Sequence, residues 1–179
     1  MTAETAPVAT PTTAARRSPA NEAELGAWRA FIQTHARLLH RLDEELQEAH
    51  GLSLAEYDAL LQLVNAPERR LRMSVLADRV LLSRSGITRL VDRLAADGMV
   101  ERFACPTDAR GSMAAITALG VSRLRSASRT HLDGVRRYFL DVVSPEEQAT
   151  IQRSLGRVSD GLKGPVLGAD SLCTAPLEA

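Results

Sequence analysis

Apolar residues recur at three- and four-residue steps along most of the chain between residues 21 and 164. The first such stripe consists of Leu25, Trp28, Phe31, Ile32, His35, Leu38, Leu39, Leu42 and Leu46. It predicts one amphipathic helix of roughly 28 residues, about 42 Å long at the α-helical rise. Asn21 and Glu24 form a capping-box pattern before it, and Gly51 stops it. One small domain cannot cover so long a helix, which points to a partner subunit.

The next segments predict short helices separated by tight turns. Ser53 and Glu56 repeat the capping-box pattern ahead of a second helix. Ser74 is expected to cap a third helix, whose inward residues would be Val75, Leu76, Ala77 and Val80. After a turn at Leu81 and Leu82, either Ser83 or Ser85 caps a fourth helix, with Ile87, Leu90, Val91 and Leu94 buried and Gly98 at its end. This order is typical of a helix-turn-helix.

Two strand-like runs follow, MVERFA and SMAAIT, separated by the turn-rich CPTDARG. They predict a hairpin, which after a helix-turn-helix would be the wing of a winged helix. From Thr117 the pattern is helical again, with Leu124, Ala127, Leu132, Val135, Phe139 and Val142 in period. A last helix starts at Ser144, Pro145 and Glu147, and its stripe is Ile151, Leu155, Val158 and Leu162. The fold class is therefore mainly α, with a small β-hairpin.

Composition fits a single soluble domain with extensions, because 45% of the 179 residues are apolar and 25% charged. Residues 1–20 and 165–179 are rich in Ala, Pro, Thr or Gly and are expected to be disordered tails. No apolar run reaches the roughly 18 residues of a membrane span, and no signal peptide precedes the helices, so a cytoplasmic protein is expected. Cys105 and Cys173 have neither the spacing of a metal cluster nor the setting of a structural disulfide.

The formal net charge of zero conceals an uneven distribution. Between residues 68 and 110, nine arginines stand against six acids, a net charge of +3; between 21 and 64, three arginines stand against eight acids, a net charge of −5. The positive excess coincides with the predicted helix-turn-helix and hairpin. A basic surface of this kind favours binding to double-stranded DNA.

The outer face of the fourth helix begins with small residues and continues with arginines: Arg84, Ser85, Gly86, Thr88, Arg89, Asp92 and Arg93. Small residues would let the helix lie deep in the major groove, where hydroxyls and guanidinium groups reach bases or phosphates. The alternative is an ordinary solvated helix face. At the hairpin tip, Arg110 could enter the minor groove with Asp108 orienting it, or the two could form a local pair in the turn.

The sequence resembles the MarR family of bacterial transcriptional regulators over most of residues 21–164. The segments that carry the resemblance are GLSLAEYDALLQL, MSVLADRVLLSRSGITRLVDRLAADGMVER and PTDARG followed by ITALG. The resemblance implies a winged-helix homodimer whose first and last two helices interlock. Each subunit would present one recognition helix to half of a pseudo-palindromic operator.

Carried over residue by residue, the recognition-helix contacts are Ser83, Arg84, Ser85, Thr88 and Arg89, and the wing-tip arginine is Arg110, supported by Asp108. Arg93 joins the predicted DNA-binding residues from its place on the outer helix face. Many members carry two successive arginines after the wing aspartate, whereas Ala109 stands at the first of these positions here. This departure implies a weaker wing contact.

Members of the family are usually released from DNA by a small aromatic or phenolic acid or by cysteine oxidation. Trp28, His35 and Tyr57 are the residues that could line a pocket for such an effector, although each also fits a packing role on its apolar stripe. Cys105 lies in the wing rather than in the first helix, where sensor thiols of the family commonly stand. The four histidines do not have metal-binding spacing, and no cofactor motif or catalytic constellation is visible, so no enzyme activity is expected.

These observations predict a ligand-responsive, DNA-binding repressor that acts as a homodimer. Its parts would be a tail at 1–20, a dimerisation helix at 21–51, a winged helix-turn-helix at 52–116, dimerisation helices at 117–164 and a tail at 165–179. The alternative is a helical dimer whose winged helix binds a protein partner.

Overall fold

The computed structural model describes residues 20–105 and 108–162, without the side chains of residues 105 and 108–111. Its elements, in chain order, are α1 (Glu22–His50), α2 (Leu54–Val64), η1 (Pro67–Arg69), β1 (Arg70–Arg72), α3 (Met73–Arg79), α4 (Arg84–Ala96), β2 (Val100–Cys105), β3 (Asp108–Ile116), α5 (Ala118–Val135), η2 (Arg136–Leu140) and α6 (Pro145–Gly161). The chain divides into two compact units, Met1–His35 and Ala36–Ala179, and the division falls inside α1. The two predicted tails lie outside the described residues, apart from residue 20.

Local hydrogen bonds set the helix starts that the sequence predicts. Reciprocal capping boxes are present at the starts of α1, α2 and α6, formed by Asn21 with Glu24, Ser53 with Glu56 and Ser144 with Glu147. Ser83, rather than Ser85, caps α4 by accepting a hydrogen bond from the Gly86 N–H at 3.1 Å. Gly51, with φ of 65°, ends α1 as expected.

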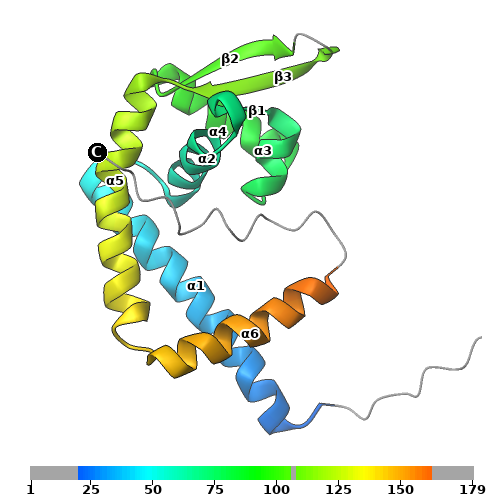
Figure 1. Cartoon of the computed structure of the whole chain (residues 1–179), viewed down its shortest axis with the longest axis vertical. Coiled ribbons are helices and arrows are strands. Elements are labelled where there is room, and N and C mark those ends of the chain that lie inside the picture. The colour runs from blue at the N-terminus through cyan, green and yellow to red at the C-terminus, as the bar shows by residue number, and fades with distance from the viewer. Residues whose placement is uncertain (1–19, 106–107, 163–179) are drawn as a thin grey trace, which may run out of the picture. The chain divides into compact units, whose positions relative to one another are not determined.

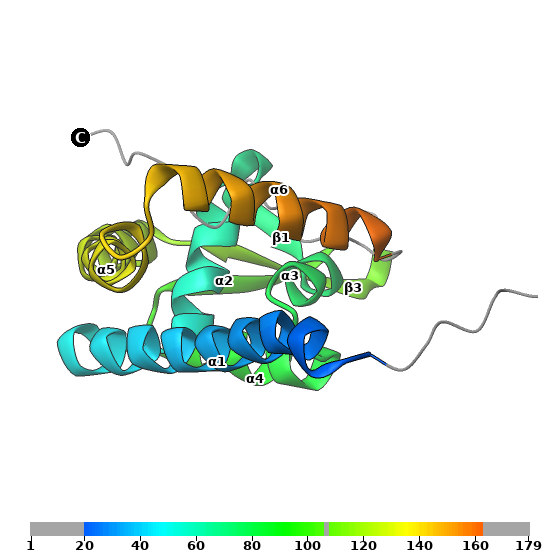
Figure 2. The same ribbon diagram turned by 90° about the horizontal axis from the view of Figure 1, so that it is seen from below.

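The core of the unit Ala36–Ala179 lies between α2, α3, α4 and a small sheet. Every residue of the predicted α4 stripe is buried: Ile87, Leu90, Val91 and Leu94. The hairpin is also confirmed, but β1 adds a third strand, which gives an antiparallel sheet in the order β1-β3-β2. In Figure 1 the β2–β3 hairpin extends beyond the α2–α4 cluster, and Figure 2 views α5 almost end-on beside that cluster. The observed architecture is a winged helix-turn-helix joined to long helices.

The start of α3 differs from the sequence prediction. The helix begins at Met73, with Arg72 in extended conformation as its N-cap residue and no capping side chain, so Ser74 does not cap it. Val75, expected to face inward, is 37% exposed, whereas Leu76 and Ala77 are buried. The helix starts early because β1 runs directly into α3. Val75 is exposed because successive residues of a helix are about 100° apart, so Val75 lies about 160° around the helix from Ala77 and cannot share its buried face.

The predicted stripes of the long helices are covered only in part by this chain. In α1, Leu42 and Leu46 are buried, but Leu25, Trp28, Phe31 and Ile32 are exposed. In α5, Leu124 and Ala127 are buried and Leu132 is exposed; α6 has no buried residue at all. Apolar helix faces left open in a single chain are typical of a surface that another subunit covers.

Candidate nucleic-acid interface

The N-terminal half of α4 carries the predicted recognition residues. Arg84, Ser85 and Arg89 are exposed and Thr88 is half-buried. The hydroxyl groups are held locally: the Ser83 and Ser85 Oγ atoms lie 3.2 Å apart, and Thr88 Oγ1 donates to the Arg84 carbonyl at 2.8 Å. Because the opposite face of α4 is anchored in the core, these side chains are presented on a rigid element.

The arginines of this region fall into two groups. Within the described residues, the guanidinium groups of Arg84 and Arg89 have no hydrogen bond or ion pair with another side chain. Arg93, in contrast, donates from Nε to Glu56 Oε1 of α2 at 2.9 Å. Arg102 of β2 pairs with Asp92 of α4. The first group is available for an external anion, and the second ties α4 to its neighbours.

Glu56 and Asp92 are site residues that the sequence prediction did not assign as partners of arginines. Burial tends to raise the pKa of the Glu56 carboxyl, but the hydrogen bonds from Ser53 and Arg93 outweigh it and lower the pKa below 4.5. Glu56 is therefore a charged carboxylate at neutral pH. Arg102 also reaches Ser112 Oγ at 3.5 Å, so one guanidinium links α4 to both strands of the hairpin.

The wing is present as the β2–β3 hairpin. Its register shifts between Ala104 and Cys105, where Cys105 pairs with Asp108. The side chains of Cys105, Asp108 and Arg110 lie outside the described residues, as does the whole of Cys173. The predicted wing contacts therefore stay predictions.

The three residues predicted to line an effector pocket, Trp28, His35 and Tyr57, lie in different units of the chain. Trp28 is 59% exposed and His35 is also exposed; both flank Phe31, with ring centroids 6.3 Å and 6.1 Å away. Tyr57 belongs to the other unit and is 5% exposed. Its ring packs 4.6 Å from that of His131, and its hydroxyl donates to Ser128 Oγ at 3.4 Å. Tyr57 therefore has the packing role that the sequence left open, between α2 and α5.

Because His131 is buried against Tyr57, it makes the free energy of unfolding depend on pH. Burial lowers its pKa below 6.5, and within the described residues its buried Nδ1 has no hydrogen-bond partner. In the unfolded chain, the His131 side chain takes up a proton near the ordinary pKa of histidine. In the folded chain it does so only at a lower pH. Stability is then complete above pH 6.5 and falls as the pH drops towards the lower, folded-state pKa.

We expect a His131→Phe variant to lose part of this pH dependence. Thermal unfolding of the parent at pH 7.5 and pH 5.5 should give a larger decrease in Tm than the same pair of measurements on the variant. His35→Gln is the control, because the His35 side chain is exposed and forms no ion pair among the described residues, and this variant should show the same decrease as the parent. Equal decreases for the parent and His131→Phe would contradict the assignment.

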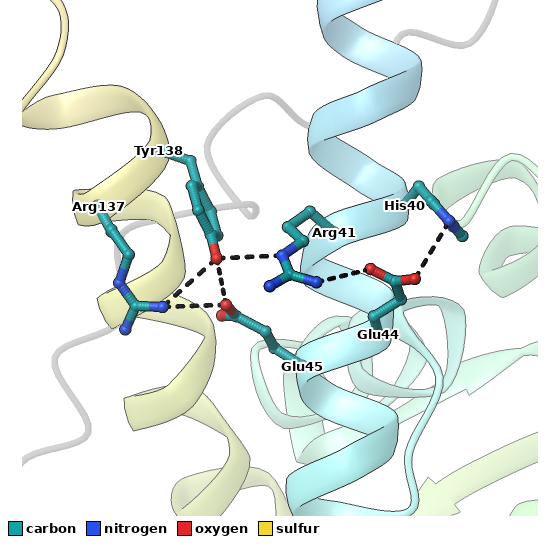
Figure 3. A network of polar contacts seen from close by, with 6 residues as sticks. All are labelled: His40, Arg41, Glu44, Glu45, Arg137 and Tyr138. Carbon is teal, nitrogen blue, oxygen red and sulfur yellow. Dashed lines mark hydrogen bonds and ion pairs between the residues drawn. The ribbon is translucent and has the colours of Figure 1, made fainter.

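A polar network joins α1 to η2 (Figure 3). Glu45 of α1 accepts hydrogen bonds from the Tyr138 hydroxyl and from Arg137 Nη1, the latter at 3.0 Å. Arg41 donates from Nε to the Tyr138 oxygen at 3.3 Å and from Nη1 to Glu44 Oε2 at 3.0 Å. These bonds fix the C-terminal half of α1 against η2.

Two classes of site are not found in the described part of the chain. No three His, Cys, Asp or Glu side chains there are grouped so that they could hold a metal ion. None of the helices in that part has the length and hydropathy that a bilayer-spanning segment needs.

Comparison with known proteins matches this architecture to one family. A family model described as MarR family matches residues 50–111. The HTH-type transcriptional regulator MhqR of Bacillus subtilis is 31% identical over 109 residues, which are 61% of this chain and 73% of the relative. The chain belongs to the MarR family. As a MarR-family protein it is a DNA-binding transcriptional regulator with a winged helix-turn-helix, and not an enzyme.

Solved structures extend the similarity of this MarR-family protein beyond the winged helix. Sco3205, a MarR family transcriptional regulator from Streptomyces coelicolor solved in complex with DNA, is 33% identical with a TM-score of 0.79, over 85% of this chain and 95% of that one. AbsC, a MarR family transcriptional regulator from the same organism, is 30% identical with a TM-score of 0.76, over 83% and 99%. The long helices of this protein therefore belong to the family fold as well.

Proposed function

We propose that this regulator is a homodimeric repressor that binds a pseudo-palindromic operator and is released by a small effector. One observation supports this DNA-binding site. Arg84 and Arg89 are exposed and have no ion-pair partner among the described residues, and the opposite face of their helix is anchored in the core. A guanidinium without a protein partner gains most from a phosphate or a base edge. Arg93 and Arg102, which have carboxylate partners, are less suited to that contact.

The proposed reading surface consists of Ser83, Arg84, Ser85, Thr88 and Arg89 in the major groove, with Arg110, supported by Asp108, in the minor groove. The helix-turn-helix and hairpin at 52–116 would bind DNA, and the helices at 21–51 and 117–164 would form the dimer. The exposed apolar faces of α1 and α6 support this division. Two symmetric subunits would read two related half-sites.

Repression and effector release are the finer parts of the proposal. YetL of Bacillus subtilis, an HTH-type transcriptional repressor, is 28% identical over 71% of this chain and 75% of its own length. The effector would be a small aromatic acid, whose ring could stack on the exposed aromatic side chains of Trp28 and His35 in the N-terminal half of α1. Effector release would then be a competition between two arrangements of the dimer, one whose recognition helices are spaced to fit the operator and one whose spacing does not fit. A ligand can release DNA only if it binds the second arrangement more tightly than the first.

The test begins with selection of genomic fragments that bind the parent protein. An Arg89→Ala, Arg110→Ala double variant should then bind the selected fragment at least about 10³-fold more weakly at the same salt concentration, because the homodimer loses four contacts and each contributes roughly 1–3 kcal/mol. Gel shift on folded, dimeric protein gives the affinities. If the double variant binds as tightly as the parent, this reading surface is wrong. If the parent captures a protein partner and no DNA, the winged helix is a protein-binding module.

A further inference from the structure

The first turn of α2 is bonded both to the long helix α1 and to the recognition helix α4. On one side, Asp43 of α1 accepts a hydrogen bond at 2.7 Å from the Leu54 N–H, the first N–H of α2. On the other side, Glu56 of that turn accepts from Arg93 of α4 at 2.9 Å. A charged side chain therefore holds the turn on each side, one from the long helix α1 and one from the recognition helix.

Glu56 caps α2 and at the same time pairs with Arg93 of α4, because its two carboxylate oxygens have different partners. Oε2 accepts from the Ser53 N–H at 3.0 Å and from Ser53 Oγ at 2.9 Å, which completes the capping box. Oε1 accepts from Arg93. The Glu56 side chain is only 11% exposed, against 59% for Arg93. A buried carboxylate that lost this cation would be left with an unsatisfied oxygen, so the pair strongly favours one position of α4.

The pair lies towards the end of α4 that is remote from the reading surface. Arg93 follows Arg84 by nine residues, about 13 Å along the helix axis. A small rotation of α4 about this point would move Arg84 and Ser85 relative to the groove. Arg93 is on the outer face of α4, yet its Nε–H donates to Glu56 Oε1.

We propose that Glu56 is a positioning residue that transmits the placement of α1 and α2 to the recognition helix through Arg93, and that Arg93 acts on DNA binding through Glu56 rather than by touching DNA. The inference rests on the proposed function, in which α4 reads the operator. It assigns to Arg93 a role different from the direct contact that its sequence position suggests.

Binding of the selected operator over a series of salt concentrations separates the two roles of Arg93. We expect Arg93→Gln and Glu56→Gln each to weaken binding about tenfold, and the double variant to bind no more weakly than either single variant. The slope of log K against log salt concentration should equal that of the parent, because no phosphate contact is lost. A slope reduced by about two in Arg93→Gln, one for each subunit of the dimer, with parental affinity in Glu56→Gln, would show direct phosphate contact and overturn the proposal.

Ser53→Ala is the matched control for a purely structural effect. It removes the hydroxyl that donates to Glu56 Oε2 and leaves the Arg93 pair on Oε1 intact. We expect this variant to have a lower Tm but parental DNA affinity when it is folded. If it weakens binding as much as Glu56→Gln does, the effect comes from the stability of α2, and the positioning role is wrong.

Operators whose half-sites are moved apart by one base pair give a readout that loss of stability alone would not change. The parent should discriminate against the altered spacing, and Arg93→Gln and Glu56→Gln should discriminate less, because α4 is held less firmly. If Arg93→Gln and Glu56→Gln discriminate against the altered spacing as strongly as the parent does, the positioning role is wrong, although the proposed function can still hold. A parent protein that binds no DNA would contradict the proposed function itself.

Discussion

Aspartate in place of both Leu155 and Val158 is expected to convert the protein to a monomer and to weaken operator binding about 10²–10⁴-fold, the usual gain from joining two binding modules. These α6 side chains are 39% and 59% exposed in the single chain, and α6 has no buried residue. The substitutions therefore leave the core of the chain untouched. They would place two charges in the apolar surface that the proposed dimer buries.

Sedimentation velocity and gel shift on the same samples check this expectation. Arg157→Asp is the control, because Arg157 is an exposed α6 residue about 100° around the helix from Val158 and about 160° from Leu155, and its replacement makes the same change of −2 in net charge. This variant should remain dimeric, with affinity reduced only by the charge effect. A double aspartate variant that stays dimeric and binds DNA like the parent would show that α6 does not form the subunit interface.

Alanine in place of Gly120 is expected to destabilise the fold by about 3 kcal/mol. A Cβ atom at this position would lie 2.2 Å from the Met99 carbonyl oxygen and 2.7 Å from Cγ1 of Ile116. The Met99 oxygen is backbone and also accepts a hydrogen bond from the Thr117 N–H at 3.0 Å, so it cannot move freely. Relief of the clash would pull the start of α5 away from the turn that leads into β2.

Gly156→Ala is the matched control for the Gly120 substitution. An added Cβ at Gly156 in α6 meets nothing within 4 Å, so the better helix propensity of alanine should stabilise the protein by about 0.5–1 kcal/mol. Thermal unfolding should show Tm lowered by about 6–12 °C for Gly120→Ala and slightly raised for Gly156→Ala. Equal Tm values for the two variants would contradict the packing at the start of α5.

The features that follow from near neighbours in the chain could be predicted from the sequence. The apolar stripe of α4 is an example, because apolar positions at helical spacing specify their own geometry. The sequence narrowed the cap of α4 to Ser83 or Ser85, and the structure selects Ser83. The capping boxes of α1, α2 and α6 follow the same logic. The early start of α3 could not be read in this way, because β1 sets it by pairing with β3, some forty residues further along the chain.

The role of individual arginines depends on contacts that no local pattern reveals. Arg89 and Arg93 are four residues apart on one helix and look alike in the sequence, yet Glu56, 37 residues before Arg93, distinguishes them. Arg102 is likewise explained only by Asp92, which the turn after α4 brings against β2. The helical period could thus predict the face of α4 on which Arg89 and Arg93 lie. The carboxylates that pair with Arg93 and Arg102 could be identified only from the tertiary structure.

Hydroxyl-radical footprinting on a selected genomic fragment tests whether the two α4 helices of a dimer bind the two halves of one operator. We expect two protected segments related by a two-fold axis, with centres about one helical turn of DNA, or a multiple of it, apart. Both segments should lose protection together in Arg89→Ala. A single unsymmetrical protected segment, or protection that Arg89→Ala leaves unchanged, would contradict the account.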